Sequence, residues 1–377
     1  MFCSSALFFC VELFFFLLRV ILSGEKRKAV CEVELFPPIP RMLLRTIRSS
    51  RCSDFDYAQG DTVEKARGKA CNAAEAESTE DAIGVCMKNT NFFKEILTMK
   101  IGVSSYSFSK YMKQTGCDLK EVCCLAKGIG FDAIEFTDLK VEDPIALAGE
   151  LRALCAEIGL EISAYAVGMN LLKGDGEENV QKLFSCVDVA KALGAPVMRH
   201  DICSSLPEGM TWEEAIPVMA PMIRRVTEYA AEKGIRTCSE NHGFIFQDSL
   251  RVEKVINAVD HENYRWLLDI GNFLCADENP TDAIERALPY TVHVHVKDFL
   301  YRKTEGLEVL PDGFFKTRNG NLLRGTILGH GDVPVAACVK RIREYGYDGT
   351  VSLEFEGAEE NLNAVRLGYS YMRKLIK

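Results

Sequence analysis

The chain has 377 residues, of which 47% are hydrophobic, and its formal net charge is −9. This composition excludes a chain that is intrinsically disordered throughout, because it offers enough apolar residues to bury a core. The negative charge argues against a protein that binds nucleic acid or an anionic membrane surface, since both partners require clustered positive charge.

Residues 1–98 differ in composition from the rest of the chain. They contain 13 Lys+Arg and 13 Asp+Glu, so the remaining 279 residues carry the whole net charge. The segment begins with an apolar run from Ala6 to Ser23, which Glu12 and Arg19 interrupt. These charges, and the lack of Lys or Arg before the run, argue against a signal peptide or a membrane anchor. We expect residues 1–98 to be a poorly ordered extension.

Residues 99–105, Met-Lys-Ile-Gly-Val-Ser-Ser, are typical of a start methionine followed directly by a buried strand. We therefore hypothesise that the native protein begins near Met99 and that residues 1–98 come from an upstream start assignment. A mature N-terminus near residue 1, measured by mass spectrometry on protein from its natural host, would contradict this hypothesis.

From Met99 onward, short apolar runs alternate with longer amphipathic ones, which is typical of repeated βα units. Helical patterns such as 180–193, 212–233 and 335–345 lie between the apolar runs. Eight units in 279 residues predict a (β/α)8 TIM barrel over residues 99–377, since such barrels have about 250 residues. A doubly wound sheet is the alternative, although no G-x-G-x-x-G follows a strand. The eight predicted strands are Lys100–Ser105, Phe131–Phe136, Glu161–Ala166, Pro196–His200, Arg236–Glu240, Arg265–Asp269, Thr291–Val296 and Thr350–Phe355.

Nine of the 15 cysteines follow residue 98, and no two of these nine form a C-x-x-C pair. Several lie within apolar patterns, where a cysteine behaves as a small hydrophobic residue. They predict free thiols in a reducing compartment, so we expect a cytoplasmic protein.

Acidic and histidine side chains occur at the ends of the last four predicted strands. They are Glu240, Asp269, His295 and Glu354. The carboxyl ends of barrel strands meet on one face, and three carboxylates buried there repel one another unless a cation balances their charge. We therefore expect one divalent metal ion. The donor set favours Mn²⁺ or Mg²⁺, and Co²⁺ or Zn²⁺ also suit it.

Five segments resemble the sugar phosphate isomerase/epimerase family, whose members have a xylose isomerase-like TIM barrel. They are Ser239–Gly243, Leu268–Asn272, His293–Asp298, Gly329–Val333 and Tyr347–Glu354. The resemblance covers residues 99–377 and implies a divalent metal on Glu240, Asp269, His295 and Glu354. It also implies a keto-sugar or polyol-like substrate, with Glu240 and Glu354 as the catalytic base and acid.

The chemistry of such a reaction agrees with these residues. Isomerising or epimerising a ketose removes a proton from the carbon next to a carbonyl and returns it elsewhere. A metal ion on the carbonyl oxygen stabilises the enediolate that forms, and carboxylates on opposite sides of the substrate transfer the proton. We predict a divalent-metal-dependent sugar isomerase or epimerase.

Further polar residues near the strand ends are candidates for the same site. The predicted substrate-binding residues are Glu135, His200, Asn272 and Lys297. Ion pairs inside the barrel or at its rim are the alternative for Glu135, His200 and Lys297. His242 lies two residues beyond Glu240, where it is either a catalytic acid/base or a structural histidine of the loop.

Two features beside the predicted ligands carry separate expectations. His293 and His295 are two residues apart and face the same side of their strand. The resemblance favours His295 as the ligand, so we expect His293 to be a packed, hydrogen-bonded histidine. The insertion from Leu300 to Leu328 is long for a loop, and either a lid over the site or disorder would explain it. Arg324 within it is a candidate anion contact.

Three functions are alternatives to the isomerase or epimerase. A metal-dependent lyase or dehydratase acting on a keto-inositol or keto-glycoside is the main alternative. An apurinic endonuclease is disfavoured for two reasons. The chain has only six histidines, which are too few for the three-zinc cluster of such enzymes, and residues 99–377 are acidic, which disfavours binding to DNA. The intact metal ligands argue against a non-catalytic subunit. We expect the partner to be a small carbohydrate substrate. We expect no binding to nucleic acid, and no membrane association of residues 99–377. A homo-oligomer is compatible with the sequence.

Overall fold

The computed structural model describes residues 99–309 and 311–377 of the chain. The predicted poorly ordered extension and the upstream start assignment concern residues 1–98, which lie outside the described residues. The predicted domain boundary at residue 99 stays a prediction.

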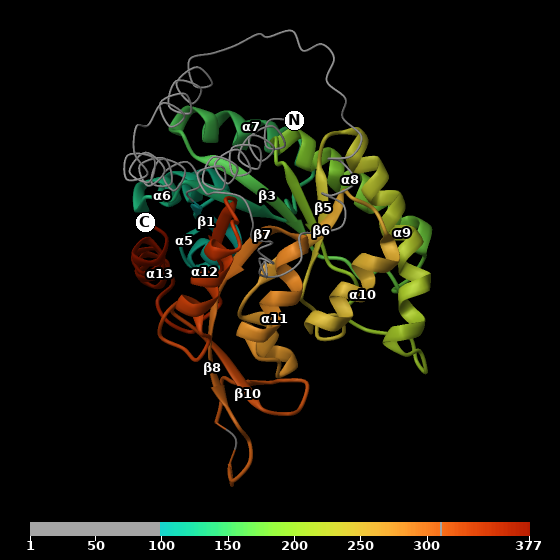
Figure 1. Ribbon diagram of the computed structural model, residues 1–377. Helices are drawn as coiled ribbons and strands as arrows, with labels where there is room; N and C mark the ends of the chain where they lie inside the picture. Colours follow the sequence, from blue (N-terminus) through green and yellow to red (C-terminus); the bar gives the residue numbers. More distant parts are fainter. Residues whose placement is uncertain (1–98, 310) are drawn as a thin grey trace, which may run out of the picture. The chain divides into compact units, whose positions relative to one another are not determined.

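Eight parallel strands close into a barrel in the order β1–β11–β7–β6–β5–β4–β3–β2 (Figure 1). The strands are β1 (Lys100–Ser104), β2 (Ala133–Thr137), β3 (Glu161–Val167), β4 (Val197–His200), β5 (Arg236–Glu240), β6 (Tyr264–Asp269), β7 (Thr291–Val296) and β11 (Thr350–Leu353). Pairing of β1 with β11, from Lys100 opposite Thr350, closes the ring. The predicted TIM barrel is confirmed, and each predicted strand end lies within two residues of the observed one.

Helices connect the strands and cover the outside of the barrel (Figure 1). They are α5 (Ser109–Thr115), α6 (Leu119–Ile129), α7 (Pro144–Ile158), α8 (Gly176–Leu193), α9 (Trp212–Glu232), α10 (Ser249–Val259), α11 (Pro280–Ala287), α12 (Val335–Glu344) and α13 (Asn361–Ile376). Local chemistry sets several of their ends. Asp118 with Glu121 and Thr211 with Glu214 form capping boxes at the starts of α6 and α9. Gly159 ends α7 in the left-handed region, at φ 68°.

The interior of the barrel consists of an apolar layer with a polar layer beyond it. Ala164, Val197, Cys238 and Leu267 form a small buried cluster that is separate from the main core. Glu240 follows Cys238 by two residues, so alternation along β5 points both side chains inward. Asp269 follows Leu267 in the same way on β6. The apolar layer therefore lies beneath the carboxylates at the carboxyl ends of the strands.

The insertion after β7 is folded. Its strands β8 (Asp298–Arg302), β9 (Phe315–Lys316) and β10 (Leu322–Thr326) form an antiparallel sheet with β10 in the middle, and β8 and β10 extend beyond the barrel in Figure 1. The carboxylate of Asp277 accepts hydrogen bonds from Thr317 and Asn321, which ties the sheet to the barrel. Disorder is therefore the wrong alternative for the described residues of this insertion.

The nine described cysteines are free, and six of them are buried. This agrees with the prediction of free thiols that pack as small hydrophobic residues. The cytoplasmic location stays a prediction. None of the helices in the described part of the chain combines the length and the hydropathy that a membrane span requires.

Candidate metal centre

Four side chains from consecutive strands of the closed barrel meet at its carboxyl end. Glu240 and Asp269 end β5 and β6, His295 lies in β7, and Glu354 directly follows β11. One ligand atom of each lies within 4.8 Å of the others. His295 Nδ1 is 3.9 Å from Glu240 Oε1, 3.8 Å from Asp269 Oδ2 and 3.7 Å from Glu354 Oε2. The structure thus brings the four predicted ligands together.

One of these four atoms lacks the hydrogen bond that a buried polar atom normally forms. Within the described part of the chain, His295 Nδ1 is buried and has no hydrogen-bond partner, while Asp269 Oδ2 has none apart from its ion pair with Lys297. A buried ring nitrogen without a partner is uncommon in folded proteins, and a bound ion is one explanation for it. Carboxylate oxygens with one imidazole nitrogen suit a divalent cation such as Mn²⁺, Mg²⁺ or Zn²⁺. The residues present therefore fit the predicted metal.

Backbone groups orient Asp269. Its Oδ1 accepts hydrogen bonds from the backbone N–H groups of Gly271 and Asn272, at 2.8 and 2.9 Å, which leaves Oδ2 free to face the other ligands. The turn needs glycine at position 271, because a Cβ there would lie 2.5 Å from Lys297 Cγ and 3.0 Å from the Lys297 carbonyl oxygen. The side chain of Asn272 donates to Glu240 Oε1 at 2.8 Å. The segment after β6 thus positions two of the carboxylates.

Burial and crowding change the acidity of these carboxyl groups. Desolvation, opposed by Lys297 and reinforced by Glu240 and Glu354, raises the pKa of Asp269 to about 7. Desolvation also raises the pKa of Glu354, but Lys297 and His295 outweigh it and hold that pKa well below the ordinary value. The two carboxyl groups therefore depend on nearby positive charge to stay ionised.

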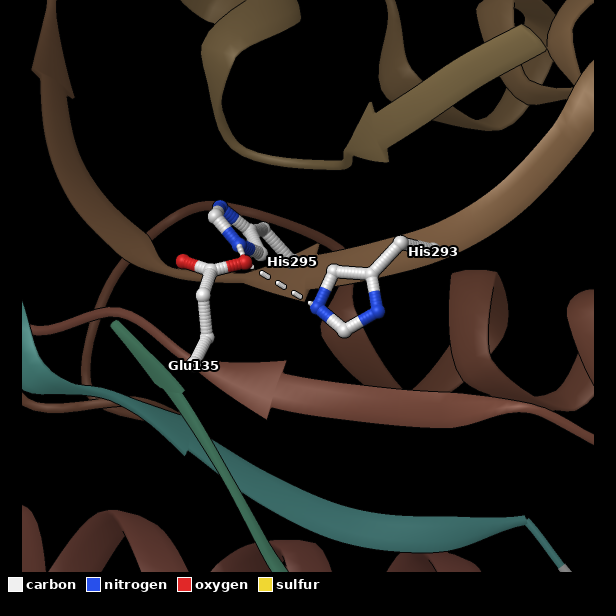
Figure 2. A group of neighbouring side chains, drawn as sticks. All are labelled: Glu135, His293 and His295. Carbon is white, nitrogen blue, oxygen red and sulfur yellow. Dashed lines mark hydrogen bonds and ion pairs between the residues drawn. The ribbon is translucent and has the colours of Figure 1, made fainter. Parts of the chain in front are cut away.

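The other ring nitrogen of His295 contacts Glu135 (Figure 2). Glu135 Oε2 lies 2.9 Å from His295 Nε2 and 3.2 Å from His293 Nε2, and the glutamate is fully buried. His293 Nε2 is also 3.2 Å from Ser352 Oγ, so the prediction of a packed, hydrogen-bonded His293 is confirmed. Burial raises the pKa of Glu135, but the two histidines lower it well below the ordinary value. A carboxylate on the second nitrogen commonly orients a metal-binding histidine.

Arg199, which was not among the predicted site residues, holds Glu240. Its Nη2 lies 2.6 Å from Glu240 Oε2 and 2.8 Å from Asp201 Oδ1, and the side chain is buried. Burial raises the pKa of Asp201, but Arg199 and His242 outweigh it and lower that pKa to about 2. An arginine within the fully buried strand Val197–His200 is the signal that could have identified it.

His242 and Lys297 line the same cavity as the ligands. His242 Nδ1 is 2.8 Å from Asp201 Oδ1, and its side chain is 44% exposed. Desolvation lowers the pKa of His242, but the hydrogen bond and charge of Asp201 raise it above the ordinary value. Lys297 Nζ contacts Glu354 Oε2 directly and is 3.1 Å from Asp269 Oδ2. A lysine therefore touches two of the candidate ligands.

A cavity of about 440 Å³ opens onto this group of residues. It is lined by Tyr106, Thr137, Asp138, Lys140, Ala166, Gly168, Arg199, Glu240, His242, His295, Lys297, Glu354 and Glu356. Of the predicted substrate-binding residues, only Lys297 lines it. Glu135 and Asn272 are buried against His295 and Glu240, and the Nδ1 of buried His200 lies 2.9 Å from the backbone oxygen of Asp201. No described residue from 300 to 328 lines the cavity, so a lid is not seen and Arg324 lies elsewhere.

A larger cavity, of about 1120 Å³, lies outside the barrel among α5, α6 and α13. It contains none of the predicted ligands. Chemistry, and not size, therefore selects the cavity at the carboxyl ends of the strands.

A family model described as "Xylose isomerase-like TIM barrel" matches residues 124–375. Among curated proteins, the inosose dehydratase of Clostridium botulinum (strain Alaska E43 / Type E3) is 25% identical over 153 residues, which cover 38% of this chain and 48% of the relative. The match thus spans about half the length of that relative.

Solved structures share the fold at low identity. The IOLI protein with a bound zinc atom has a TM-score of 0.58 at 16% identity, covering 74% of this chain and 98% of that one. D-Psicose 3-epimerase with D-tagatose, from Clostridium cellulolyticum H10, has a TM-score of 0.55 at 17% identity, covering 74% of this chain and 100% of that one. At these identities the two likenesses show the fold alone.

Proposed function

This chain belongs to the xylose isomerase-like TIM barrel family, and from that premise we propose that it is a divalent-metal-dependent enzyme that isomerises or epimerises a keto-sugar or a related polyol. The convergence of three carboxylates with His295 Nδ1, beside a cavity of about 440 Å³ that Glu240, His295 and Glu354 line, is the observation that supports this proposal most. Similarity to proteins named as a dehydratase and an epimerase agrees with it.

The metal would be held by Glu240, Asp269, His295 and Glu354. Mn²⁺ or Mg²⁺ suits the three carboxylates best, and Co²⁺ or Zn²⁺ would also bind. When bound, a divalent cation supplies the positive charge that polarises a carbonyl and makes the proton on the neighbouring carbon more acidic. Asp269 takes no further part, since its other oxygen is committed to the backbone of Gly271 and Asn272.

Glu240 and Glu354 are the proposed base and acid. Both line the cavity, and β6 and β7 lie between their strands in the barrel, so the two carboxylates reach the cavity from strands that are not neighbours. Arg199 fixes Glu240 through Oε2, and Lys297 contacts Glu354 Oε2. One carboxylate would remove the proton next to the carbonyl and the other would return it.

The remaining predicted residues receive more specific roles in this proposal. Glu135 orients His295, and Asn272 orients Glu240, while Lys297 faces the cavity. His242 is exposed to the cavity and paired with Asp201, so it can accept or donate a proton there. His200 supports the loop after β4 through its contact with Asp201.

Dehydration of a keto-inositol, or lyase cleavage of a keto-glycoside, is the second candidate function. Two observations favour it: the matched relatives include an inosose dehydratase, and His242 offers a third proton-transfer group beside Glu240. These reactions begin with the same removal of a proton next to a carbonyl. They differ in the next step, in which a hydroxyl or an alkoxide leaves.

Metal analysis tests the proposed centre. We expect about one equivalent of Mn²⁺ on the wild-type protein and a loss of about 100-fold or more in affinity for Glu240→Gln, Asp269→Asn and Glu354→Gln, because each removes a charged ligand. Glu344→Gln, on an exposed part of α12, is the matched control and should bind metal normally. Full occupancy in all three site variants would refute the centre.

Incubation of the metal-loaded enzyme with candidate ketoses and inososes in heavy water tests the reaction. An isomerase or epimerase exchanges a carbon-bound proton for deuterium and keeps the molecular formula otherwise unchanged. A dehydratase forms a product that has lost one water molecule, and a lyase forms two products. Absence of exchange and of new products, across both substrate classes and with metal bound, would contradict both candidate functions.

A further inference from the structure

We propose that Lys297 occupies the place of the divalent cation in the metal-free protein, and that Glu356 receives its ammonium group when metal binds. This inference rests on the metal centre proposed above. It assigns a role to Glu356, and it makes metal affinity depend on a residue outside the four ligands.

The contacts of Lys297 are with the metal-facing oxygens. Its Nζ contacts Glu354 Oε2 and lies 3.1 Å from Asp269 Oδ2. These same two oxygens lie 3.7 and 3.8 Å from His295 Nδ1 and belong to the group of four ligand atoms. Lys297 is 3% exposed. The ammonium group is therefore inside the centre and contacts half of its ligands.

Charge balance explains why a cation is there. Buried carboxylates are strongly destabilising unless positive charge compensates them. Arg199 compensates Glu240 through its Oε2, and in the described chain only Lys297 and His295 lie within 4 Å of Asp269 or Glu354 as cationic partners. A divalent cation at the same oxygens would take over this compensation, and it would repel the ammonium group.

Glu356 is the carboxylate to which the ammonium group of Lys297 would move. Its Oε1 lies 3.7 Å from Lys297 Nζ, it lines the cavity, and its side chain is 29% exposed. Within the described residues, Lys297 is the only cation found within 4 Å of Glu356. Gly271 packs against Lys297 Cγ so closely that a Cβ there would lie at 2.5 Å, which holds the inner part of the lysine side chain. The proposed movement therefore involves the outer part of the lysine side chain, whose ammonium group is already 3.7 Å from Glu356 Oε1.

Isothermal titration calorimetry with Mn²⁺, at one pH and ionic strength, measures the effect. We expect Lys297→Met to bind Mn²⁺ about 10-fold more tightly than wild type, because it removes the competing cation. We expect Glu356→Gln to bind about 10-fold more weakly, because the displaced ammonium group loses its partner. In the Lys297→Met background, the same Glu356→Gln change should alter affinity by less than about threefold, since no ammonium group remains to be received.

Controls separate this inference from simple changes of charge. Lys140→Met removes a lysine that lines the same cavity, and it should leave Mn²⁺ affinity within about twofold of wild type. If Lys297→Met does not fold, Lys297→Gln also removes the charge while keeping a hydrogen-bond donor, and the cycle is run with that variant.

Each other outcome overturns a different statement. A wild-type protein that binds no Mn²⁺, Mg²⁺, Co²⁺ or Zn²⁺ would remove the metal centre, and this inference with it. Metal binding with an equal effect of Glu356→Gln in both backgrounds would leave the centre intact but show that Glu356 acts only as a distant charge. Weaker binding by Lys297→Met would show that the lysine orients the ligands and does not compete with metal.

Discussion

The two halves of the barrel contribute different residues to the site. The ligand half, made of β5, β6, β7 and β11, supplies Glu240, Asp269, His295 and Glu354. The support half, made of β1 to β4 and their loops, supplies none of these four. It supplies Glu135, which contacts His295, and Arg199, which contacts Glu240 from the neighbouring strand, and it supplies much of the cavity wall.

This difference shows how a closed barrel stabilises a crowded acidic centre. The ligand half alone places three carboxylates beside one another, with Lys297 as their nearest lysine. The support half adds the arginine that pairs with Glu240 and the carboxylate that orients His295. A ligand in one half is thus held by a residue in the other. Arg199 and Glu240 lie on the directly paired strands β4 and β5, whereas closure of the ring between β1 and β11 brings Glu135 of β2 to His295 of β7.

The largest expected effect comes from the ligand half. Glu240→Gln removes both a metal ligand and the proposed base, so kcat/KM should fall by about 10³-fold or more. Steady-state assays on the substrate found by deuterium exchange measure this. The exposed Glu344→Gln variant should keep wild-type activity, and a Glu240→Gln variant with activity near wild type would show that proton transfer does not need this carboxylate.

Loss of Arg199 from the support half should have the second largest effect. This effect is on protein stability and not on catalysis. Arg199→Met leaves Glu240 and Asp201 without their shared cation in a buried site, and this should lower the free energy of unfolding by about 3 kcal/mol or more. Urea denaturation of the metal-free protein gives the value. Glu240→Gln in the same chain should recover part of the loss. No recovery would indicate that packing, and not charge, causes the destabilisation.

Removing the carboxylate that orients His295 should have a smaller effect. Glu135→Gln keeps the shape of the side chain but weakens its hold on His295 Nε2, so Mn²⁺ affinity should fall by about 10- to 100-fold. Calorimetric titration measures the change, with Glu161→Gln on the exposed start of β3 as a matched control. Unchanged affinity would mean that packing alone sets the position of the imidazole.

The smallest effect is expected at the exposed wall of the support half. Lys140 lines the cavity but contacts none of the four candidate ligands. Lys140→Ala should therefore change KM by no more than about fivefold and leave metal affinity unchanged. A large loss of metal affinity in this variant would abolish the distinction between the ligand half and the cavity wall.

Much of the fold followed from local patterns. The alternation of apolar runs and amphipathic helices predicted the eight strands, and glycines such as Gly159 marked where helices end. The insertion after β7 was harder to predict. Its two-residue strand β9 and the ties to Asp277 are contacts with residues far along the chain, which its own sequence does not indicate.

Some residues of the candidate site could likewise be predicted from the sequence, and others could not. Glu240, Asp269 and Glu354 could be selected because the ends of parallel strands meet, whatever the details of packing, whereas His295 was preferred to His293 because of the family resemblance. Glu135 and Asn272 were selected as substrate contacts, but the structure places them against His295 and Glu240. Arg199 and Glu356 were not selected, because a charged residue near a strand end does not by itself indicate its partner.

The sequence by itself determined the barrel, the eight strand positions and the four side chains that converge at their ends. These properties depend on periodicity and on strand order, which are written along the chain. Only the tertiary structure decided which cation balances each carboxylate and which nitrogen of His295 faces them. Those choices depend on distances of a few ångströms across a closed ring, between residues as far apart as Glu135 and His295 in the sequence.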